Sequence, residues 1–526
     1  MQVTRNPGTP GLVLFGSQAG GYDRSEMPDP FLYPPMKLED DLVRDLRRLN
    51  PWWEGGSTPA LPRTRRHLVR QIHTRLELRL APIVVVRGPR QIGKTTAQLQ
   101  VLADLLERDV SGRSILRLQV DELPALTKLE EPLLRVVDWF EANVLGRTLN
   151  DAAKRGEKTY LFLDEVQNLP AWAPQLKFLV DSSTTQVVVT DSSALRIELG
   201  RDSLAGRVNT IEAGTLSLTE IANFRGIPLG PPILEDNGLE SLSRREFWLE
   251  LRADGLRRRA VRDRAFASFS ERGGYPLVHE RVEAPWAAVA DQLNETVIQR
   301  VIQHDLRVGE RGRKRDAALL EELFRLACRY VGQAPGVVLL AREAQRALGA
   351  DIGAERVRQY LRFLNDTLLL RLVEPLEIRL KKRRASPKIC LADHGLRASW
   401  LQQVVPLEPT ALAREPHLTD LAGHVAESVV GAALSTISHL DLAHFPQRGS
   451  EPEVDFVLTF GTKRIPLEVK YQRRIDSLAD TEGLRTFIEK AANNAPFGIL
   501  VTQTDTDAVA DPRLVALPLS SLLLLR

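Results

Sequence analysis

The feature that most constrains this chain is a glycine-rich loop between an apolar run and a helical pattern. The run Ile83–Val86 predicts a buried strand, and the spacing of apolar residues in Thr95–Glu107 predicts a helix. The loop matches the pattern G-x-x-x-x-G-K-[ST] in full. Its residues are Gly88, Pro89, Arg90, Gln91, Ile92, Gly93, Lys94 and Thr95, followed by Thr96. A strand, such a loop and a helix in this order predict a parallel α/β domain with a phosphate-binding loop.

The chemistry of this loop predicts binding of ATP with Mg²⁺. Glycines let successive backbone N–H groups turn toward phosphate oxygens, and the positive end of the following helix adds to the attraction. We expect Lys94 to contact the β- and γ-phosphates and the Thr95 hydroxyl to ligate Mg²⁺. A glycine turn without a ligand is the alternative, but it leaves the flanking strand and helix unexplained.

An acidic pair follows a second apolar run. Tyr160–Leu163 predicts another buried strand, and Asp164 and Glu165 come directly after it. We expect Asp164 to hold Mg²⁺, directly or through water, and Glu165 to polarise the attacking water as a general base. Two acidic residues at this position favour ATP hydrolysis over nucleotide storage.

Further short apolar runs alternate with helical stretches as far as about Phe224. Ile115–Val120 and Gln186–Thr190 are such runs, which is typical of a parallel sheet covered by helices. The last run ends in Thr190, Ser192 and Ser193. A polar side chain at this strand end either senses the γ-phosphate or only caps the strand, and the sequence leaves both readings open.

Motifs spread over most of the chain carry a family resemblance. They are Asn50–Trp53, Gly88–Thr96, Leu163–Pro170 with Trp172, Asp191–Ala194, Leu204–Arg207 and Gly273–Pro276. Together they resemble a family of prokaryotic AAA-type P-loop ATPases with a C-terminal domain of unknown function. The resemblance implies an ATPase core, a winged-helix middle and a nuclease-like end. Family members usually have Gly-Ser-Ser after the sensor strand, and Asp191 replaces that glycine here.

An arginine closes one of these motifs. Arg207 is either an arginine finger, acting in cis or from a neighbouring subunit, or a solvated surface residue. Because AAA-type sites often lie between subunits, a homo-oligomer is compatible with the first reading.

A second acidic site is expected near the C-terminus. Val454–Leu458 and Ile465–Lys470 read as two strands joined by a tight turn at Gly461, which sets Asp455 across from Glu468. Lys470 shares a face with Glu468, and Glu427, on a predicted helix, adds a third carboxylate.

This hairpin resembles the core of PD-(D/E)xK nucleases. In that reading Asp455, Glu468 and Glu427 hold Mg²⁺ or Mn²⁺, and Lys470 orients the attacking water or stabilises the reacting phosphate. Val454 stands where the family pattern has proline. Two alternatives stay open: a nuclease fold that binds nucleic acid without cutting it, and an exposed salt-bridge cluster.

Charge gives only local support for a DNA partner. The formal net charge is +3 over 526 residues, so any DNA-binding surface must be local. The basic runs Arg311–Arg315 and Arg379–Arg384, with Lys388, either contact phosphates or form solvated loops. Arg448 is a further phosphate-contact candidate.

The overall prediction is an α/β protein of several domains. We expect an N-terminal arm (1–60), a P-loop AAA-type ATPase domain (61–225), a helical linker or lid (226–310), a winged-helix-like domain (311–400) and a restriction-endonuclease-like α/β domain (401–526). Cys328 and Cys390 read as core residues of a protein in a reducing compartment. Without a signal sequence or a membrane-length apolar run, a cytoplasmic location is expected.

Two functions follow from these expectations. The leading one is an ATP-driven protein that acts on DNA and controls its access to a metal-dependent C-terminal nuclease. The alternative is a nucleotide-dependent switch whose nuclease-like end only binds DNA or a partner.

Overall fold

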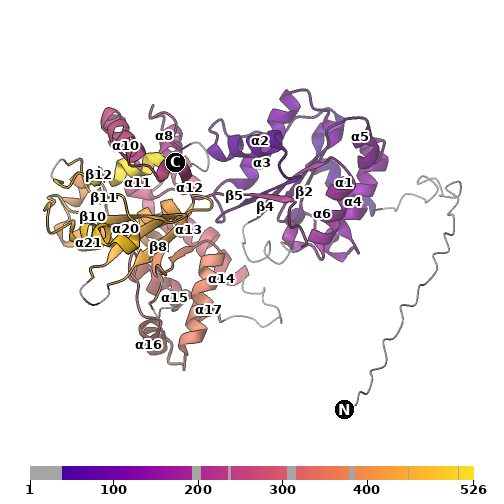
Figure 1. Ribbon diagram of the computed structural model, residues 1–526. Helices are drawn as coiled ribbons and strands as arrows, with labels where there is room; N and C mark the ends of the chain where they lie inside the picture. Colours follow the sequence, from indigo (N-terminus) through magenta and orange to yellow (C-terminus); the bar gives the residue numbers. More distant parts are fainter. Residues whose placement is uncertain are drawn as a thin grey trace, which may run out of the picture.

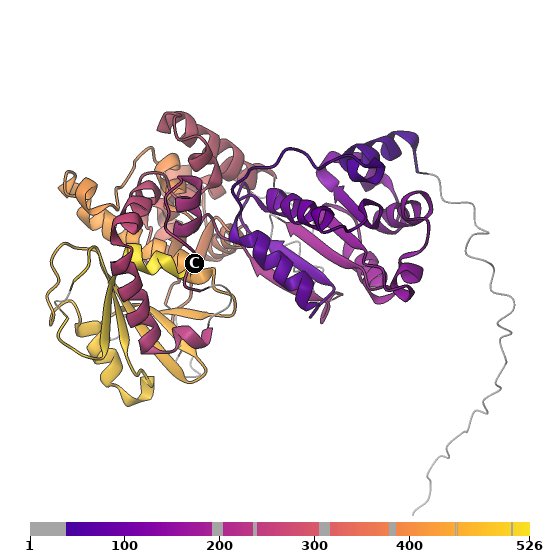
Figure 2. The ribbon, with the colours of Figure 1, turned by 90° about the horizontal axis from the view of Figure 1, so that it is seen from above.

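The chain folds into two lobes. The computed structural model describes residues 38–191, 203–234, 239–304, 316–377, 385–447, 449, 451–506 and 509–526. Figures 1 and 2 show the elements up to β5 in one lobe and those from α8 onward in the other. The segment between β5 and α8, residues 213–217, crosses from the first lobe to the second.

A parallel sheet forms the core of the first lobe, in the order β2-β3-β4-β1-β5. Its strands are β1 (Ile83–Arg87), β2 (Ile115–Gln119), β3 (Tyr160–Asp164), β4 (Gln186–Asp191) and β5 (Val208–Glu212). The helices of this lobe include α2 (His67–Leu78), α3 (Lys94–Glu107), α4 (Pro132–Phe140), α5 (Leu149–Lys154) and α6 (Trp172–Asp181). The predicted parallel sheet is confirmed, whereas the edge strand β5 was not predicted.

The residues before α2 are anchored on strand β2. Helix α1 (Asp40–Leu49) leads into Trp52 and Trp53, both of which are buried. The two indole Nε1 groups donate hydrogen bonds to the carbonyl oxygen of Ile115, at 3.1 and 2.8 Å. These contacts pack the aromatic pair on the α/β domain.

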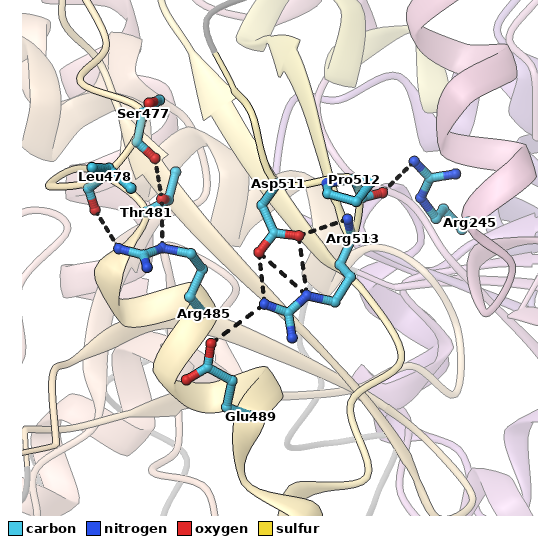
Figure 3. A network of polar contacts seen from close by, with 9 residues as sticks. All are labelled: Arg245, Ser477, Leu478, Thr481, Arg485, Glu489, Asp511, Pro512 and Arg513. Carbon is cyan, nitrogen blue, oxygen red and sulfur yellow. Dashed lines mark hydrogen bonds and ion pairs between the residues drawn. The ribbon is translucent and has the colours of Figure 1, made fainter.

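The helices of residues 239–304 pack on different elements of the second lobe. They are α9 (Leu239–Leu242), α10 (Arg245–Arg257), α11 (Arg259–Arg272), α12 (Pro276–Glu280), α13 (Trp286–Leu293) and α14 (Arg300–His304), and they follow α8 (Leu218–Phe224). The buried Arg262 of α11 pairs with Asp505 at 3.0 Å. Arg245 of α10 donates to the carbonyl oxygen of Pro512 at 2.6 Å, beside the Arg513–Asp511 pair (Figure 3). A linker or lid was predicted here, and it stays a prediction; α10 contacts strand β12, and both α10 and α11 contact α22.

Three helices and an antiparallel strand pair follow. They are α15 (Ala317–Arg329), α16 (Val337–Leu348), α17 (Ala354–Asp366), β6 (Leu370–Val373) and β7 (Lys388–Leu391). These elements lie within the predicted winged-helix-like domain (311–400), and the second strand of the pair begins at Lys388. Strand β7 packs against a helix, α20, rather than projecting into solvent as a free wing. Cys328 and Cys390 are both buried, as predicted for core residues.

The C-terminal sheet has the order β12-β11-β10-β9-β8. Strands β8, β9 and β10 are antiparallel, while β10, β11 and β12 run parallel. The elements are α18 (His394–Trp400), α19 (Pro409–Leu412), α20 (Thr419–Ser435), β8 (Asp441–Phe445), β9 (Val454–Phe460), β10 (Lys463–Lys470), α21 (Glu482–Glu489), β11 (Gly498–Thr502), β12 (Leu514–Pro518) and α22 (Leu519–Leu522). The predicted turn at Gly461, with φ of +60°, joins β9 to β10. Within the described part of the chain, no helix is both long and apolar enough to cross a bilayer.

Candidate nucleotide site and C-terminal acidic site

The glycine-rich loop has the backbone that its sequence requires. It connects the buried strand β1 to the N-terminus of α3. Gln91 and Gly93 have φ of +61° and +86°, so the chain turns sharply before the helix. A Cβ at Gly88 would lie 2.4 Å from the carbonyl oxygen of Ala213, so only glycine fits there. The Ile92 side chain is buried and anchors the loop in the core of the domain.

Two side chains expected to bind phosphate and metal stand at the start of α3. Lys94 Nζ donates to the carbonyl oxygens of Gly88 and Pro89 at 2.8 and 2.7 Å. Thr95 Oγ1 donates to Asp164 Oδ2 at 2.7 Å. A hydroxyl and a carboxylate beside a phosphate loop are donors that suit Mg²⁺, which combines one or two carboxylates with substrate oxygens. The residues present therefore fit ATP with Mg²⁺.

Strand β4 lies between β1 and β3 and adds a third side chain. Thr190 Oγ1 donates to Asp164 Oδ1 at 2.5 Å, so both carboxylate oxygens of Asp164 accept a hydroxyl hydrogen bond. Of the predicted sensor residues, Thr190 thus lies beside Asp164, while Ser192 and Ser193 lie outside the described residues. Gln98 of α3 donates to Thr190 Oγ1 at 3.2 Å and ties the helix to this strand.

Glu165 occupies a strained position just after β3. Its φ is +54°, a left-handed conformation that is uncommon for a glutamate. Its carboxylate accepts a hydrogen bond from Gln167 Nε2 at 2.5 Å. Burial raises the pKa of Glu165, and the Lys94 and Arg90 charges oppose this rise without cancelling it. A carboxylate with a raised pKa is a stronger base than an exposed one.

Arg66, just before α2, was missed by the sequence reasoning and joins the two lobes. Its guanidinium donates to the carbonyl oxygens of Ile92 at 2.7 Å and Thr215 at 3.1 Å, and to Glu220 Oε2 of α8 at 2.9 Å. The only local signal was the capping box Ser217-x-x-Glu220, which predicts the start of α8 but not the ion pair.

Arg207 lies where strand β1 begins, whereas the phosphate loop lies where β1 ends. Its carbonyl oxygen accepts a hydrogen bond from Ile83 N, at the start of β1, whereas the loop follows Arg87 at the strand's end. The guanidinium pairs with Asp181 at 2.5 and 2.9 Å. Strand β1 has five residues, so at about 3.3 Å per residue its two ends lie about 16 Å apart. This separation argues against Arg207 as a finger in cis, and a finger from a neighbouring subunit stays a prediction.

A second ion-pair chain crosses between the lobes next to the loop. Glu212, at the end of β5, lies 3.3 Å from Arg87 and 2.5 Å from Arg371 of β6. A cavity of about 150 Å³ is lined by Glu212 and Arg371, and also by Pro89 of the loop and Arg66. The phosphate loop is therefore connected to the second lobe through two charged contacts.

The predicted C-terminal acidic residues come together on the hairpin and on α20. Pairing of Leu467 with Phe456 sets Asp455 next to Glu468, and the Asp455 amide donates to Glu468 Oε2 at 3.3 Å. Lys470 Nζ lies 2.8 Å from Glu468 Oε1. Glu427 approaches the group from α20. Burial and the nearby Asp455 raise the pKa of Glu468 to about 8, although Lys470 opposes the rise.

Lys388 is the member of this site that the sequence reasoning misplaced. It was grouped with the basic wing, yet it is 1% exposed, and its Nζ lies 2.6 Å from Asp455 Oδ1 and 3.0 Å from Glu427 Oε2. Burial lowers the pKa of Lys388, but the attraction of Asp455 and Glu427 outweighs it, so the net pKa is raised and the side chain is an ammonium.

The predicted metal set of Glu427, Asp455 and Glu468 is corrected by this arrangement. Across the described residues, no group of three or more His, Cys, Asp and Glu side chains is placed to hold a metal ion. The Lys388 ammonium also lies between two of the three carboxylates, at 2.6 Å from Asp455 Oδ1 and 3.0 Å from Glu427 Oε2. The basic runs Arg311–Arg315 and Arg379–Arg384, and Arg448, lie outside the described residues.

Comparison with known proteins assigns the first lobe and leaves the second open. Residues 81–222 match the family model of an AAA domain, while residues 263–406 and 422–522 match two domains of unknown function, DUF8612 and DUF4143. Uncharacterized proteins of Mycobacterium bovis and Mycobacterium tuberculosis are each 25% identical over 404 residues, covering 75% of this chain and 72% of theirs.

A solved structure, a Walker-type ATPase of Pyrococcus abyssi, is 16% identical. It covers 65% of this chain and 99% of its own, with a TM-score of 0.33. The AAA family match covers residues 81–222, and the strand, loop and helix in that range have the geometry of a P-loop ATPase domain.

Proposed function

We propose that this chain hydrolyses ATP through Lys94, Thr95, Asp164 and Glu165. The observation that carries the proposal is the Asp164 carboxylate, which accepts hydrogen bonds from Thr95 of the phosphate loop and Thr190 of the neighbouring strand. These contacts bring together a loop that suits phosphate and an acidic pair that suits hydrolysis.

Each side chain has a distinct role in the proposed reaction. Lys94 offsets negative charge on the β- and γ-phosphates, and the backbone N–H groups of the loop orient them. Mg²⁺, which Thr95 Oγ1 and Asp164 would hold, supplies further charge neutralisation when bound. Glu165 accepts a proton from the attacking water, and its raised pKa makes the carboxylate a stronger base.

The test separates binding from chemistry. Lys94→Ala should abolish both ATP binding and turnover, because it removes the cation that meets the phosphates. Glu165→Gln should retain ATP binding, measured by calorimetry, and lower turnover by about 10² or more, as expected for loss of a general base. Glu122→Gln, at an exposed acidic residue after β2, is the matched control and should behave as the parent chain. Normal turnover in Glu165→Gln would contradict the proposed base.

We further propose that the ATPase acts on nucleic acid through a nuclease-like C-terminal domain. Three features support this: a mixed sheet preceded by α20, the Asp455–Glu468 pairing, and Lys470 beside Glu468. DNA cleavage with ATP and divalent metal is the test, and Glu468→Ala should abolish any cleavage while ATP turnover continues. A folded protein that cuts no DNA under any of these conditions would remove the nuclease part of the proposal.

A second candidate is a nucleotide-dependent switch whose C-terminal domain binds without cutting. Lys388 favours it, because an ammonium already satisfies two of the carboxylates that a nuclease would use for metal. Measuring ATP turnover with and without DNA separates the two candidates. Marked stimulation by DNA supports the first candidate, whereas turnover indifferent to DNA, with nucleotide-dependent partner binding, supports the switch.

A further inference from the structure

The two carboxylates of the C-terminal hairpin have all their oxygens engaged by the protein. Asp455 Oδ1 accepts from Lys388 Nζ at 2.6 Å, and Oδ2 accepts from the Val469 amide at 2.9 Å. Glu468 Oε1 lies 2.8 Å from Lys470 Nζ, and Oε2 accepts from the Asp455 amide at 3.3 Å. The hairpin therefore presents carboxylates whose hydrogen bonds are already made.

The cation at the centre of this site comes from another part of the chain. Lys388 begins β7, and its side chain is 2% exposed. Its Nζ also contacts Glu427 Oε2 at 3.0 Å and lies 5.2 Å from the ring centroid of Phe456. A buried ammonium is costly unless carboxylates surround it, and buried carboxylates are costly without a cation. The ammonium and the acids thus stabilise one another.

A divalent metal bound to the same carboxylates would need the position that Lys388 Nζ holds. The oxygens of Asp455 and Glu427 lie 2.6 and 3.0 Å from Nζ, while Mg²⁺ sits about 2.0–2.1 Å from its oxygen ligands. A dication and an ammonium also repel each other at such distances. Binding one therefore requires displacement of the other.

The acidic site is open to a cavity, so a lack of access does not explain the exclusion of metal. A cavity of about 560 Å³ opens onto Lys388, Glu427, Asp455 and Glu468. One water needs about 10–15 Å³ on the same measure, so the cavity has room for a hydrated ion beside the carboxylates. Exclusion therefore rests on the charge and position of Lys388.

We propose that Lys388 is the built-in cation of the acidic site and that it excludes divalent metal from Asp455 and Glu427. The inference rests on the second candidate above, in which the C-terminal domain binds without cutting, because a metal-dependent nuclease would need the metal that Lys388 excludes. It is independent of ATP hydrolysis. It assigns Lys388 as the residue that decides whether this domain binds metal. Replacing its charge by a neutral side chain turns the site into one that binds Mn²⁺ or Mg²⁺.

The test uses the full chain without nucleotide and Mn²⁺ as the probe. Electron paramagnetic resonance of free Mn²⁺ compares the parent chain, Lys388→Met, and Lys388→Met combined with Asp455→Asn. Lys388→Met should bind about one Mn²⁺ per chain at least about tenfold more tightly than the parent chain, since a unit charge is removed from the site. The double variant should lose this binding. Asp455→Asn in the parent chain should leave Mn²⁺ binding unchanged, because the parent site holds no metal.

A stability measurement accompanies the binding assay. In Lys388→Met the buried carboxylates lack their ammonium, so added Mn²⁺ should raise the thermal unfolding midpoint of this variant and leave the parent unchanged. Circular dichroism checks folding, and Lys388→Gln is a second variant if the first does not fold. Asp455-dependent Mn²⁺ binding by the parent chain overturns the proposal, as does a folded neutral variant that binds none. ATP turnover in these variants tests the proposed ATPase function and does not test the role of Lys388.

Discussion

Replacing Glu220 by glutamine tests how strongly Arg66 joins the phosphate loop to the second lobe. The Glu220 carboxylate accepts hydrogen bonds from two guanidinium nitrogens of Arg66, at 2.9 and 3.1 Å, and from the amides of His67 and Ser217, at 2.8 and 2.9 Å. Glutamine keeps the size of the side chain and one acceptor oxygen but removes the charge. The change therefore isolates the electrostatic part of this contact.

The expected magnitude follows from the pKa of Glu220. Burial by itself would raise this pKa, but the Arg66 charge and the hydrogen bonds lower it from 4.5 to about 2. Because the folded pKa lies below the unfolded one, the charge stabilises the fold fully above pH 4.5 and progressively less as the pH falls toward 2. The difference corresponds to about 3 kcal/mol at pH 7 and about 1.4 kcal/mol at pH 3.

Hydrogen–deuterium exchange of the His67 and Ser217 amides measures this effect locally. At pH 7 these amides should exchange up to about two orders of magnitude faster in Glu220→Gln than in the parent chain, and at pH 3 only about tenfold faster. Comparing the two proteins at the same pH removes the intrinsic pH dependence of exchange. Glu77→Gln is the matched control, because Glu77 pairs with Arg108 at an exposed position and should leave exchange unchanged.

Two results would refute the reasoning. Equal acceleration at pH 7 and pH 3 would mean that the charge of Glu220 is not the stabilising element, because its contribution must decline below pH 4.5. Exchange that is unchanged at both values would mean that Arg66 is satisfied by the carbonyl oxygens of Ile92 and Thr215 without the carboxylate.

Three further predictions concern the nucleotide site. Gly88→Ala should weaken ATP binding by at least about tenfold in calorimetry, because the added Cβ would fall 2.4 Å from the Ala213 carbonyl oxygen. Thr190→Val keeps the shape but removes the hydrogen bond to Asp164, so kcat in a phosphate-release assay should fall about tenfold, for a loss of about 1.5 kcal/mol, with little change in KM. Arg207→Ala should leave the ATP turnover of dilute, monomeric protein within about twofold of the parent, because Arg207 lies at the end of β1 away from the phosphate loop. A large loss of turnover in this variant would contradict that placement.

Local patterns predicted the parts of the fold that depend on local chemistry. Strand β1, the glycine loop and α3 follow one another directly, so a single motif determined all three. The Asp455–Glu468 pairing was predicted because a tight turn at Gly461 determines which residues of the two strands face each other. Strand β5 was missed because Val208–Glu212 lies at the sheet edge, where half-buried polar residues interrupt the apolar run that identifies a central strand.

Long-range charge pairs could not be predicted in the same way. Arg66 and Glu220 are separated by 154 positions, and Lys388 and Asp455 by 67. A basic run normally reads as a solvated surface, and Lys388 looked like the last member of one. Only the packing of β7 against α20 carries its ammonium into the acidic site, and no periodicity in the sequence encodes that packing.

The same strand pair contacts both sites of the chain. In the β6–β7 ladder, Val373 lies opposite Lys388 and Arg371 lies opposite Cys390, so Arg371 and Lys388 lie on one face, two residues apart along the strands. Arg371 reaches Glu212, which also contacts Arg87 next to the phosphate loop, while Lys388 reaches Asp455. A shift of β5 large enough to break the Glu212 contact would leave Arg371 without its counter-ion on the strand pair that positions Lys388. Strands β6 and β7 therefore contact both a residue beside the phosphate loop and the acidic site. This strand pair is the place to look for coupling between the lobes.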